Sequence, residues 1–288
     1  MRITFIRHGE SVSNAAGIWQ GHANAPLSER GVGQAQALAE RLRGEAFDRI
    51  LCSDLERAHH TARLLGAAVG RTPSTHTVWR EIHLGRWEGL SRAEVAAQYP
   101  DEIAALARGE DIAVGGGERW SELGARVQGA FDDVLASGGE HVAIVVHGGV
   151  IVTLMSLLLD VFAARPRPIG KLSNTSITRV QVGDGLEITA YNDALHIDDQ
   201  ASWRREHAER GRTVVALRPG PGAAAVELDG LDGSGPHEVT VQPDALVAWA
   251  QGRVGQGRAR WAPPTEGARC LSVGSRPGGT VWSWNEGA

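Results

Sequence analysis

Two short apolar segments, far apart in the chain, each run directly into a histidine followed by glycine. The first is Ile3 to Ile6, followed by Arg7-His8-Gly9, and the second is Val142 to Val146, followed by His147-Gly148-Gly149. Apolar runs of this length are typical of strands buried in a parallel sheet. Open α/β sheets bind their ligands at the carboxyl ends of such strands. The two histidines are therefore expected at one ligand-binding edge of a sheet.

The chain up to about residue 200 alternates predicted strands and helices. Ser28 can cap a helix whose apolar residues recur every three or four positions, and Gly115 to Gly117 reads as a plain turn between two helices. The pattern predicts an α/β fold with a doubly wound, mostly parallel sheet and helices on both faces. We expect strands at 3–6, 49–53, 142–146, 176–182 and 187–191, and helices at 28–42, 54–69, 91–108, 119–136 and 150–159.

The composition changes after about residue 203, which predicts a second domain. We expect a main domain at 1–203, a charged linker helix at 204–212 and a small C-terminal α+β appendage at 213–288. The appendage holds Trp249, Trp261, Trp282 and Trp284, whereas disordered tails are poor in aromatic residues. Buried tryptophans in a second core are the simpler interpretation, and a ligand or partner surface is the alternative.

Charge and cysteine content exclude several classes of protein. A formal net charge of -5 argues against a general nucleic-acid binder, which normally carries a basic surface. Cys52 and Cys270 are the only cysteines, which fits a reducing, cytoplasmic compartment better than a disulfide framework. The apolar segment Val150 to Leu159 is too short to span a membrane and is interpreted as a core helix. No membrane association is expected.

Four separate pieces of sequence carry groups suited to an anionic substrate. Arg7 and His8 follow the first strand, and Arg57 lies in the first turn of a predicted helix, where free N–H groups favour anions. Glu81 supplies a carboxylic acid on a loop, and His147 opens another helix. Two arginines, two histidines and one acid suit phosphoryl transfer, because that reaction chiefly needs fixed positive charge and positioning.

These pieces resemble the histidine phosphatase superfamily, which also contains the cofactor-dependent phosphoglycerate mutases. The resemblance covers roughly residues 1 to 200, and its motifs stand in the family's order. The matching stretches are Arg7-His8-Gly9-Glu10-Ser11 with Asn14, Pro26-Leu27-Ser28-Glu29-Arg30-Gly31, Ser53 to Ala62, Glu81 with Gly85-Arg86-Trp87-Glu88-Gly89, and His147-Gly148-Gly149.

The resemblance implies a role for each matching residue. His8 would be the nucleophile that becomes phosphorylated, and Glu81 would be the general acid. The phosphoryl group would be held by Arg7, Arg57 and His147, with Asn14, Gln20, Gly21 and Gly148 as further binding residues at the pocket and its mouth. The implied enzyme needs no cofactor or metal, and its partner would be a small-molecule phosphate ester.

Several alternatives stay open at this point. Glu88 competes with Glu81 as the acid, and four other histidines read as residues of the pocket rim or surface: His22, His59, His60 and His83. A mutase would need additional basic residues after Gly89, yet residues 91–120 offer only scattered arginines among acidic residues. We therefore expect a phosphatase rather than a phosphoglycerate-mutase-type transferase. A phosphate-binding protein whose tail recruits a partner is the second alternative, and substrate identity and homo-oligomerisation stay undetermined.

Overall fold

The computed structural model describes most of the N-terminal two thirds of the chain and four strands of the remainder. The described residues are 1–159, 162, 172–183, 185–194 and 196–197, together with strands β7 (Val215–Arg218), β8 (Glu238–Thr240), β9 (Arg269–Arg276) and β10 (Gly279–Glu286).

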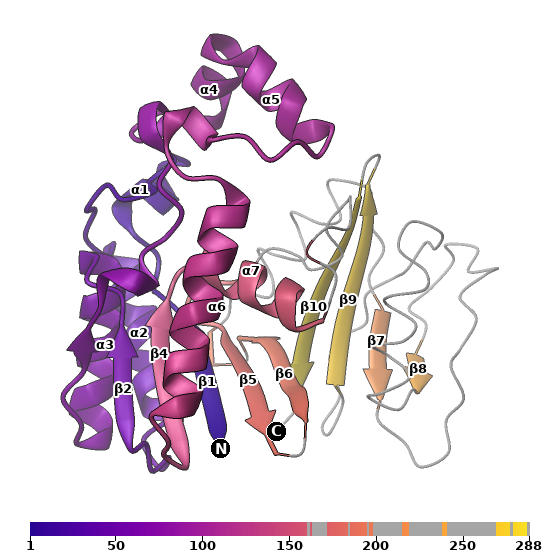
Figure 1. Ribbon diagram of the computed structural model, residues 1–288. Helices are drawn as coiled ribbons and strands as arrows, with labels where there is room; N and C mark the ends of the chain where they lie inside the picture. The colour runs from indigo at the N-terminus through magenta and orange to yellow at the C-terminus, as the bar shows by residue number, and fades with distance from the viewer. Residues whose placement is uncertain are drawn as a thin grey trace. The chain divides into compact units, whose positions relative to one another are not determined.

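A six-stranded sheet organises the N-terminal part (Figure 1). Its strands lie in the order β3-β2-β4-β1-β5-β6, so neighbouring strands are mostly not consecutive in the chain. This order requires crossover connections, which the intervening helices provide. The bounds of the strands are β1 Arg2–Arg7, β2 Arg49–Cys52, β3 Ser74–Thr75, β4 His141–Val146, β5 Ile177–Val182 and β6 Leu186–Asp193.

The pairing of β1 with β4 decides where the two histidines lie. These strands are parallel neighbours, and Arg7 pairs with Val146 at their carboxyl ends. Strand β2 is parallel to both β3 and β4, whereas β5 runs antiparallel to β1. The prediction of a mostly parallel α/β sheet is confirmed. His8 and His147 each follow the last residue of a central strand, at one edge of the sheet.

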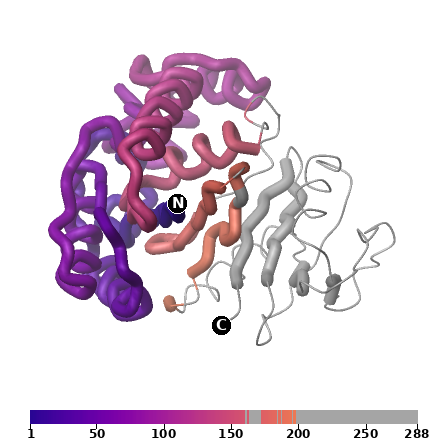
Figure 2. The backbone as a smooth tube through the Cα atoms, turned by 60° about the horizontal axis from the view of Figure 1, so that its bottom comes forward, coloured from indigo at the N-terminus to yellow at the C-terminus, as the bar shows by residue number. Residues whose placement is uncertain are grey.

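Helices cover both faces of this sheet because its central strands are apolar on both sides. In β1, Ile6 belongs to a core cluster with Leu38 and Leu65, whereas the adjacent Phe5 packs against Phe131 on the other face, with ring centroids 6.2 Å apart. Successive strand residues point to opposite faces, so neighbouring apolar residues serve two different cores. Figure 2 shows the N-terminal strand between the helical segments near residues 29–69 and those near 120–158.

The helices form largely where the apolar periodicity predicts them. Ser28 caps the second helix, and its side chain accepts a hydrogen bond from Gly31 N at 3.0 Å. The predicted helix 91–108 is divided in two at Pro100, since the residue before a proline is disfavoured in helical conformation. The helices are α1 Val12–Ala15, α2 Glu29–Arg41, α3 Glu56–Val69, α4 Arg92–Gln98, α5 Pro100–Ala107, α6 Trp120–Ala136 and α7 Gly148–Leu158.

The turn at residues 115–117, before α6, packs closely on the loop around Leu84. Gly115 has a φ of +59°, and a Cβ there would lie 2.1 Å from the carbonyl oxygen of Leu84. Only glycine fits both the left-handed conformation and this approach of two backbones. The turn therefore joins the α5–α6 connection to the Leu84 loop.

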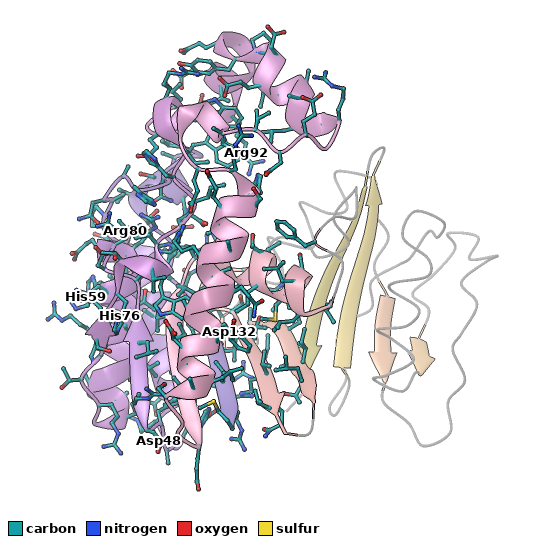
Figure 3. All side chains as sticks on the ribbon, in the orientation of Figure 1. Asp48, His59, His76, Arg80, Arg92 and Asp132 are labelled. Atoms are coloured by element: carbon teal, nitrogen blue, oxygen red, sulfur yellow. The ribbon has the colours of Figure 1, made fainter. Side chains whose placement is uncertain are left out.

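Different residues and helices lie at the two ends of the sheet. Asp48 lies at the end where β4 begins, and its Oδ2 accepts from Glu140 N at 2.6 Å and His141 N at 2.8 Å (Figure 3). Helices α1, α4 and α5 lie toward the opposite end, where β1 ends (Figure 1). His8 and His147 also lie at that end, so the candidate site is there.

A second sheet lies in the C-terminal part, with the strand order β10-β9-β7-β8. Its long hairpin of β9 and β10 pairs Trp282 with Val273 and Trp284 with Leu271. The predicted linker helix 204–212 lies outside the described residues, as do Trp249 and Trp261. By internal contacts the chain separates into Met1–Leu157 with Asn174–Thr189, and Leu158–Ser173 with Ala190–Ala288. The boundary near residue 203 stays a prediction.

Candidate active site

His8 is held by hydrogen bonds at both its ring and its backbone. Its Nδ1 lies 2.6 Å from the carbonyl oxygen of Gly9, and because a carbonyl can only accept, Nδ1 carries the proton. The ring Nε2 therefore keeps its lone pair. Asn174 Nδ2 and Thr175 N both donate to the His8 carbonyl, at 3.1 and 3.3 Å, which fixes the residue on the strand end.

The surroundings of His8 favour its neutral form. Burial, followed by the charges of Arg57 and Arg7, holds its pKa well below the ordinary value, although the hydrogen bond to Gly9 opposes the shift. A neutral imidazole with a free Nε2 is the form that can attack an electrophile. His8 thus has the protonation state of a nucleophile at neutral pH.

His147 faces His8 across the β1–β4 pair. The two ring centroids are 5.1 Å apart, and the ring planes are inclined by 59°. Both ring nitrogens of His147 are buried, and within the described part of the chain neither has a hydrogen-bond partner. Buried polar atoms are nearly always paired, so two free nitrogens indicate a place where a polar ligand binds. Burial and the charge of Arg57 also hold the pKa of His147 well below its usual value.

Two arginines surround this histidine pair. Arg57 lies in the first turn of α3, is 1% exposed, and donates from Nη1 to Ala23 O and from Nη2 to Gly21 O, each at 2.9 Å. Burial lowers the pKa of Arg57 to about 10, so it stays charged at neutral pH. Arg7 lies beside Gly148, since a Cβ on that glycine would be 3.5 Å from Arg7 Nε. A buried guanidinium group, that of Arg57, and a half-buried one, that of Arg7, thus lie beside two neutral imidazoles, an arrangement suited to binding an anion.

Glu81 is the carboxylate that reaches this centre. Its Oε2 accepts from Gly149 N at 3.1 Å, and its Oε1 accepts from Ile82 N at 3.0 Å. Gly149 lies in the first turn of α7, and a Cβ there would be 2.2 Å from Glu81 Oε1. A side chain at position 149 would therefore displace the Glu81 carboxyl group from this place.

Glu88, the other candidate for the general acid, makes hydrogen bonds that connect two loops. Its Oε1 accepts from His22 N at 2.8 Å and from Leu84 N at 3.1 Å, so it joins two loops. His22 also lies against the acid loop, with Nε2 at 2.8 Å from Glu81 O, and its ring stacks 4.9 Å from that of His83. These contacts favour Glu81 over Glu88 as the acid. His59 and His76 lie on the outer flank of the molecule (Figure 3).

The residues predicted at the mouth of the pocket make hydrogen bonds within the protein. Asn14 Oδ1 accepts from Ser11 N at 3.2 Å in a helix cap, and Gln20 Oε1 accepts from Ser11 Oγ at 2.8 Å. Gly21 has a φ of +49°, and its carbonyl orients Arg57. Gly148 lies beside Arg7, as described above. Direct phosphate contacts of these four residues stay predictions.

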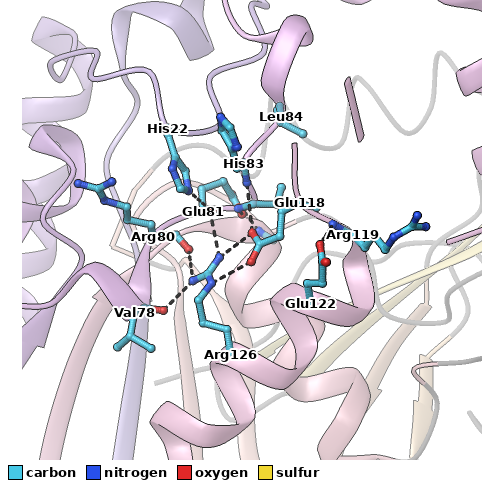
Figure 4. Close-up of polar contacts among 12 residues, drawn as sticks. His22, Val78, Arg80, Glu81, His83, Leu84, Glu118, Arg119, Glu122 and Arg126 are labelled. Atoms are coloured by element: carbon cyan, nitrogen blue, oxygen red, sulfur yellow. Dashed lines mark hydrogen bonds and ion pairs between the residues drawn. The ribbon is translucent and has the colours of Figure 1, made fainter. Parts of the chain in front are cut away.

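Sequence reasoning missed the residues that orient the site. Thr61 Oγ1 accepts from Gly9 N at 3.1 Å and donates to Arg57 O at 2.7 Å, joining the nucleophile loop to α3. Its position four residues after Arg57, on the same helix face, is a signal that could have found it. Arg126 and Glu118 hold the loop of Glu81, but nothing in their spacing alone indicates this (Figure 4).

Comparison with known proteins agrees with this geometry. The profile of the histidine phosphatase superfamily (branch 1) matches residues 3–194. The chain belongs to the histidine phosphatase superfamily. Within the described residues, no group of three or more histidine, cysteine or acidic side chains is arranged to hold a metal ion. No helix in the described part is long and apolar enough to cross a membrane.

Relatives within the histidine phosphatase superfamily include phosphatases and a probable mutase. The chain is 38% identical over 168 residues to the adenosylcobalamin/alpha-ribazole phosphatase of Salmonella typhimurium, covering 57% of this chain and 82% of that protein. It is 31% identical over 206 residues to a probable phosphoglycerate mutase of Yersinia pestis, covering 69% and 95%.

Solved structures of histidine phosphatases share the fold. A mycobacterial glucosyl-3-phosphoglycerate phosphatase matches with a TM-score of 0.61 and 32% identity, covering 66% of this chain and 98% of its own. The alpha-ribazole phosphatase of Shigella flexneri matches with a TM-score of 0.62 and 27% identity, covering 67% and 97%. Each of these structures therefore covers about two thirds of this chain.

Proposed function

We propose that this protein is a phosphatase that hydrolyses a small-molecule phosphate monoester through a phosphohistidine on His8. The observation that carries the proposal is the pair of buried, neutral imidazoles 5.1 Å apart beside two guanidinium groups. In-line transfer of a phosphoryl group chiefly requires positioning and fixed positive charge, which this arrangement supplies. The phosphatases among the relatives agree with it.

The first step transfers the phosphoryl group to His8. Its Nε2 attacks phosphorus, the bond from phosphorus to the ester oxygen breaks, and Glu81 gives its proton to the leaving oxygen. The phosphoryl oxygens are held by Arg7, Arg57 and His147, whose free ring nitrogens are within the site. When the dianion binds, it favours protonation of His147, which adds a charge-assisted hydrogen bond. The Glu81 carboxyl contributes on the order of 10² to 10⁴ in rate for esters with poor leaving groups.

The second step returns the enzyme to its starting state. Water attacks the phosphorus of phospho-His8, and the Glu81 carboxylate accepts a proton from that water. The bond from phosphorus to Nε2 breaks, which releases inorganic phosphate and neutral His8. No redox change or further reactant is needed.

Hydrolysis is favoured over a mutase reaction by the state of the arginines between 91 and 120. Arg92 lies over the ring of Trp19 at 5.2 Å, Arg108 pairs with Glu110 at 2.6 Å, and Arg119 donates to the backbone of Asp111. Each of them already has a partner within the protein. A substrate carboxylate, which a phosphoglycerate mutase must bind, would compete with these contacts.

Phosphate release from an aryl phosphate tests the proposal. We expect turnover in the unmodified protein, none in His8→Ala, and a severe reduction in Arg57→Ala, since a buried guanidinium group would be lost. Acid-labile phosphate on residue 8 should be trapped by rapid quenching with base and identified by mass spectrometry. Undiminished turnover in His8→Ala would refute the nucleophile assignment.

Substrate class is tested by a phosphate-release screen. The panel contains phosphorylated α-ribazole, glucosyl-3-phosphoglycerate, sugar phosphates and nucleotides, and 3-phosphoglycerate with its bisphosphate forms a separate arm. Net phosphate release from any ester supports a phosphatase. Efficient isomerisation of 3-phosphoglycerate without phosphate release would instead identify a mutase.

A further inference from the structure

One arginine of α6 binds the loop that carries Glu81. Arg126 Nη1 donates to the carbonyl oxygens of Val78 at 2.6 Å and Arg80 at 2.9 Å, and Nη2 lies 3.4 Å from that of Glu81 (Figure 4). Its Nε and Nη2 also donate to the two carboxylate oxygens of Glu118, at 2.9 and 2.8 Å. All three guanidinium nitrogens are thus engaged, and the side chain is 23% exposed.

Glu118 completes the attachment on the far side of Glu81. Its Oε2 accepts from His83 N at 3.2 Å in addition to its pair of bonds with Arg126. The Arg126–Glu118 pair therefore contacts the loop backbone at carbonyls before and at Glu81, and at an amide two residues after it. We call these two side chains the Arg126–Glu118 clamp.

Within the described residues, no neighbouring strand fixes the backbone of this loop, although His22 Nε2 also bonds to Glu81 O at 2.8 Å. Thr77–Trp79 and Gly85–Trp87 are single 3-10 turns, and the segment between them belongs to no strand or α-helix. In a strand, the carbonyls of Val78 and Arg80 would bind a neighbouring strand. Here the guanidinium group takes that role, because its donors lie in one rigid plane that can serve several carbonyls at once.

The position of the Glu81 carboxyl depends on this backbone. Its Oε1 bonds to the adjacent Ile82 N, and its Oε2 bonds to Gly149 N of α7. A shift of the loop would therefore move the carboxyl relative to His8 and His147. Misplacement of a reacting group by about 1 Å can cost on the order of 10²-fold in rate.

We propose that Arg126 and Glu118 are positioning residues that set the Glu81 carboxyl at the leaving-group oxygen. The inference rests on the proposed function, since the placement of an acid matters only if the protein transfers phosphoryl groups. A positioning role and a purely structural role predict different effects on the rates of activated and unactivated esters. Loss of positioning affects the step that needs a proton, and leaves attack by His8 on an activated ester unchanged.

Arg126→Lys is the informative variant, because it keeps the charge but offers a single nitrogen in place of a planar fork. The measurement is kcat/KM for a series of aryl and alkyl phosphates whose leaving groups span a wide range of acidity. We expect a loss of ~10- to 100-fold for alkyl esters, little change for the most activated aryl esters, and a steeper dependence on leaving-group pKa. Arg126→Gln should show the same dependence with a larger loss.

A double-variant comparison separates positioning from general damage. In Glu81→Gln the acid is gone, so adding Arg126→Lys should lower kcat/KM for alkyl esters no further. Arg43→Gln is the matched control, because Arg43, in the turn after α2, forms an exposed ion pair with Glu40, with exposed fractions of 61% and 68%. This control should match the unmodified protein, as exposed pairs contribute little.

The outcomes distinguish the two proposals. An equal loss for activated and unactivated esters in Arg126→Lys, or a loss that multiplies with that of Glu81→Gln, would overturn the positioning role. Thermal unfolding measured alongside shows whether Arg126→Gln folds, and Arg126→Lys carries the test if it does not. Absence of phosphate release from every ester in the unmodified protein would overturn the proposed function instead.

Discussion

Burial of His8 and His147 costs free energy of folding, and a bound anion would offset that cost. Each is held neutral by burial and by nearby guanidinium groups, and among the described residues the ring nitrogens of His147 have no hydrogen-bond partner. Residue types and their order in the chain predicted that five side chains would meet here, and the roles of these side chains stay predictions. The engagement of Glu88 in loop contacts and the roles of Thr61 and Arg126 were beyond such reasoning, because they depend on distances between segments far apart in sequence. The proton on Nδ1 of His8 depends on the conformation of the adjacent Gly9, which residue types alone do not fix.

Stability should depend on pH through these histidines. Their folded-state pKa values are lowered, so below about pH 6.5 the unfolded chain binds protons that the folded protein does not, and stability falls as pH falls. Each such histidine contributes a slope of about 1.4 kcal/mol per pH unit in that window. His147→Gln should therefore lose less stability between pH 7 and 5 than the unmodified protein, as measured by urea unfolding.

Inorganic phosphate provides the control for the pH experiment. It should raise the unfolding midpoint of the unmodified protein and have a smaller effect on His147→Gln, because binding to the folded state alone is stabilising. Identical pH slopes in the two proteins would show that His147 does not titrate as its burial suggests.

Among the elements, α2 shows most clearly how packing positions the loop that carries His8, the proposed nucleophile. A Cβ on Gly9 would lie 2.5 Å from Gly31 O, and a Cβ on Gly31 would lie 1.8 Å from Glu10 O. The loop after β1 and the first turn of α2 are thus in backbone contact. Apolar periodicity predicted α2 and its cap, but α1 and β3 are too short to have a periodicity, and neither was predicted.

Gly31→Ala tests this backbone contact. We expect a loss of about 1–3 kcal/mol in unfolding free energy, since the atom that the added Cβ would meet, Glu10 O, belongs to the backbone and cannot rotate away. Activity should fall equally for activated and unactivated esters, because the loop that holds His8 would move. Gly33→Ala is the matched control on the same helix: nothing lies within 4 Å of its added Cβ.

The control should gain roughly 0.5–1 kcal/mol, the usual difference between alanine and glycine in a helix. Its activity should be unchanged. If Gly31→Ala unfolded at the same urea concentration as Gly33→Ala, the contact between α2 and the nucleophile loop would have no energetic importance.

For the whole molecule, the family match covers only the part of the chain that contains the candidate site. The superfamily profile ends at residue 194, and the solved phosphatases each match over nearly their whole length while covering about two thirds of this chain. Composition alone indicated a change near residue 203, yet strand order was not predictable, because the pairing of β1 with β4 is not encoded in either segment by itself.

A chain that ends at residue 203 should therefore fold and keep its phosphatase activity. The expected kcat/KM for an aryl phosphate is close to that of the full chain, because all five proposed catalytic side chains lie before that point. Circular dichroism and phosphate release are the measurements. An insoluble or inactive product would show that the C-terminal part is required and that the boundary is misplaced.

The adjacency of β1 and β4 also fixes the width of the reaction centre. Neighbouring strands lie about 4.8 Å apart, and that spacing is a property of main-chain hydrogen bonding that side-chain substitution cannot alter. In the proposed mechanism, the 5.1 Å between the two ring centroids follows from this spacing and leaves room for one phosphoryl group. A change of substrate would then have to come from the loops around the two histidines, since the spacing of β1 and β4 stays the same.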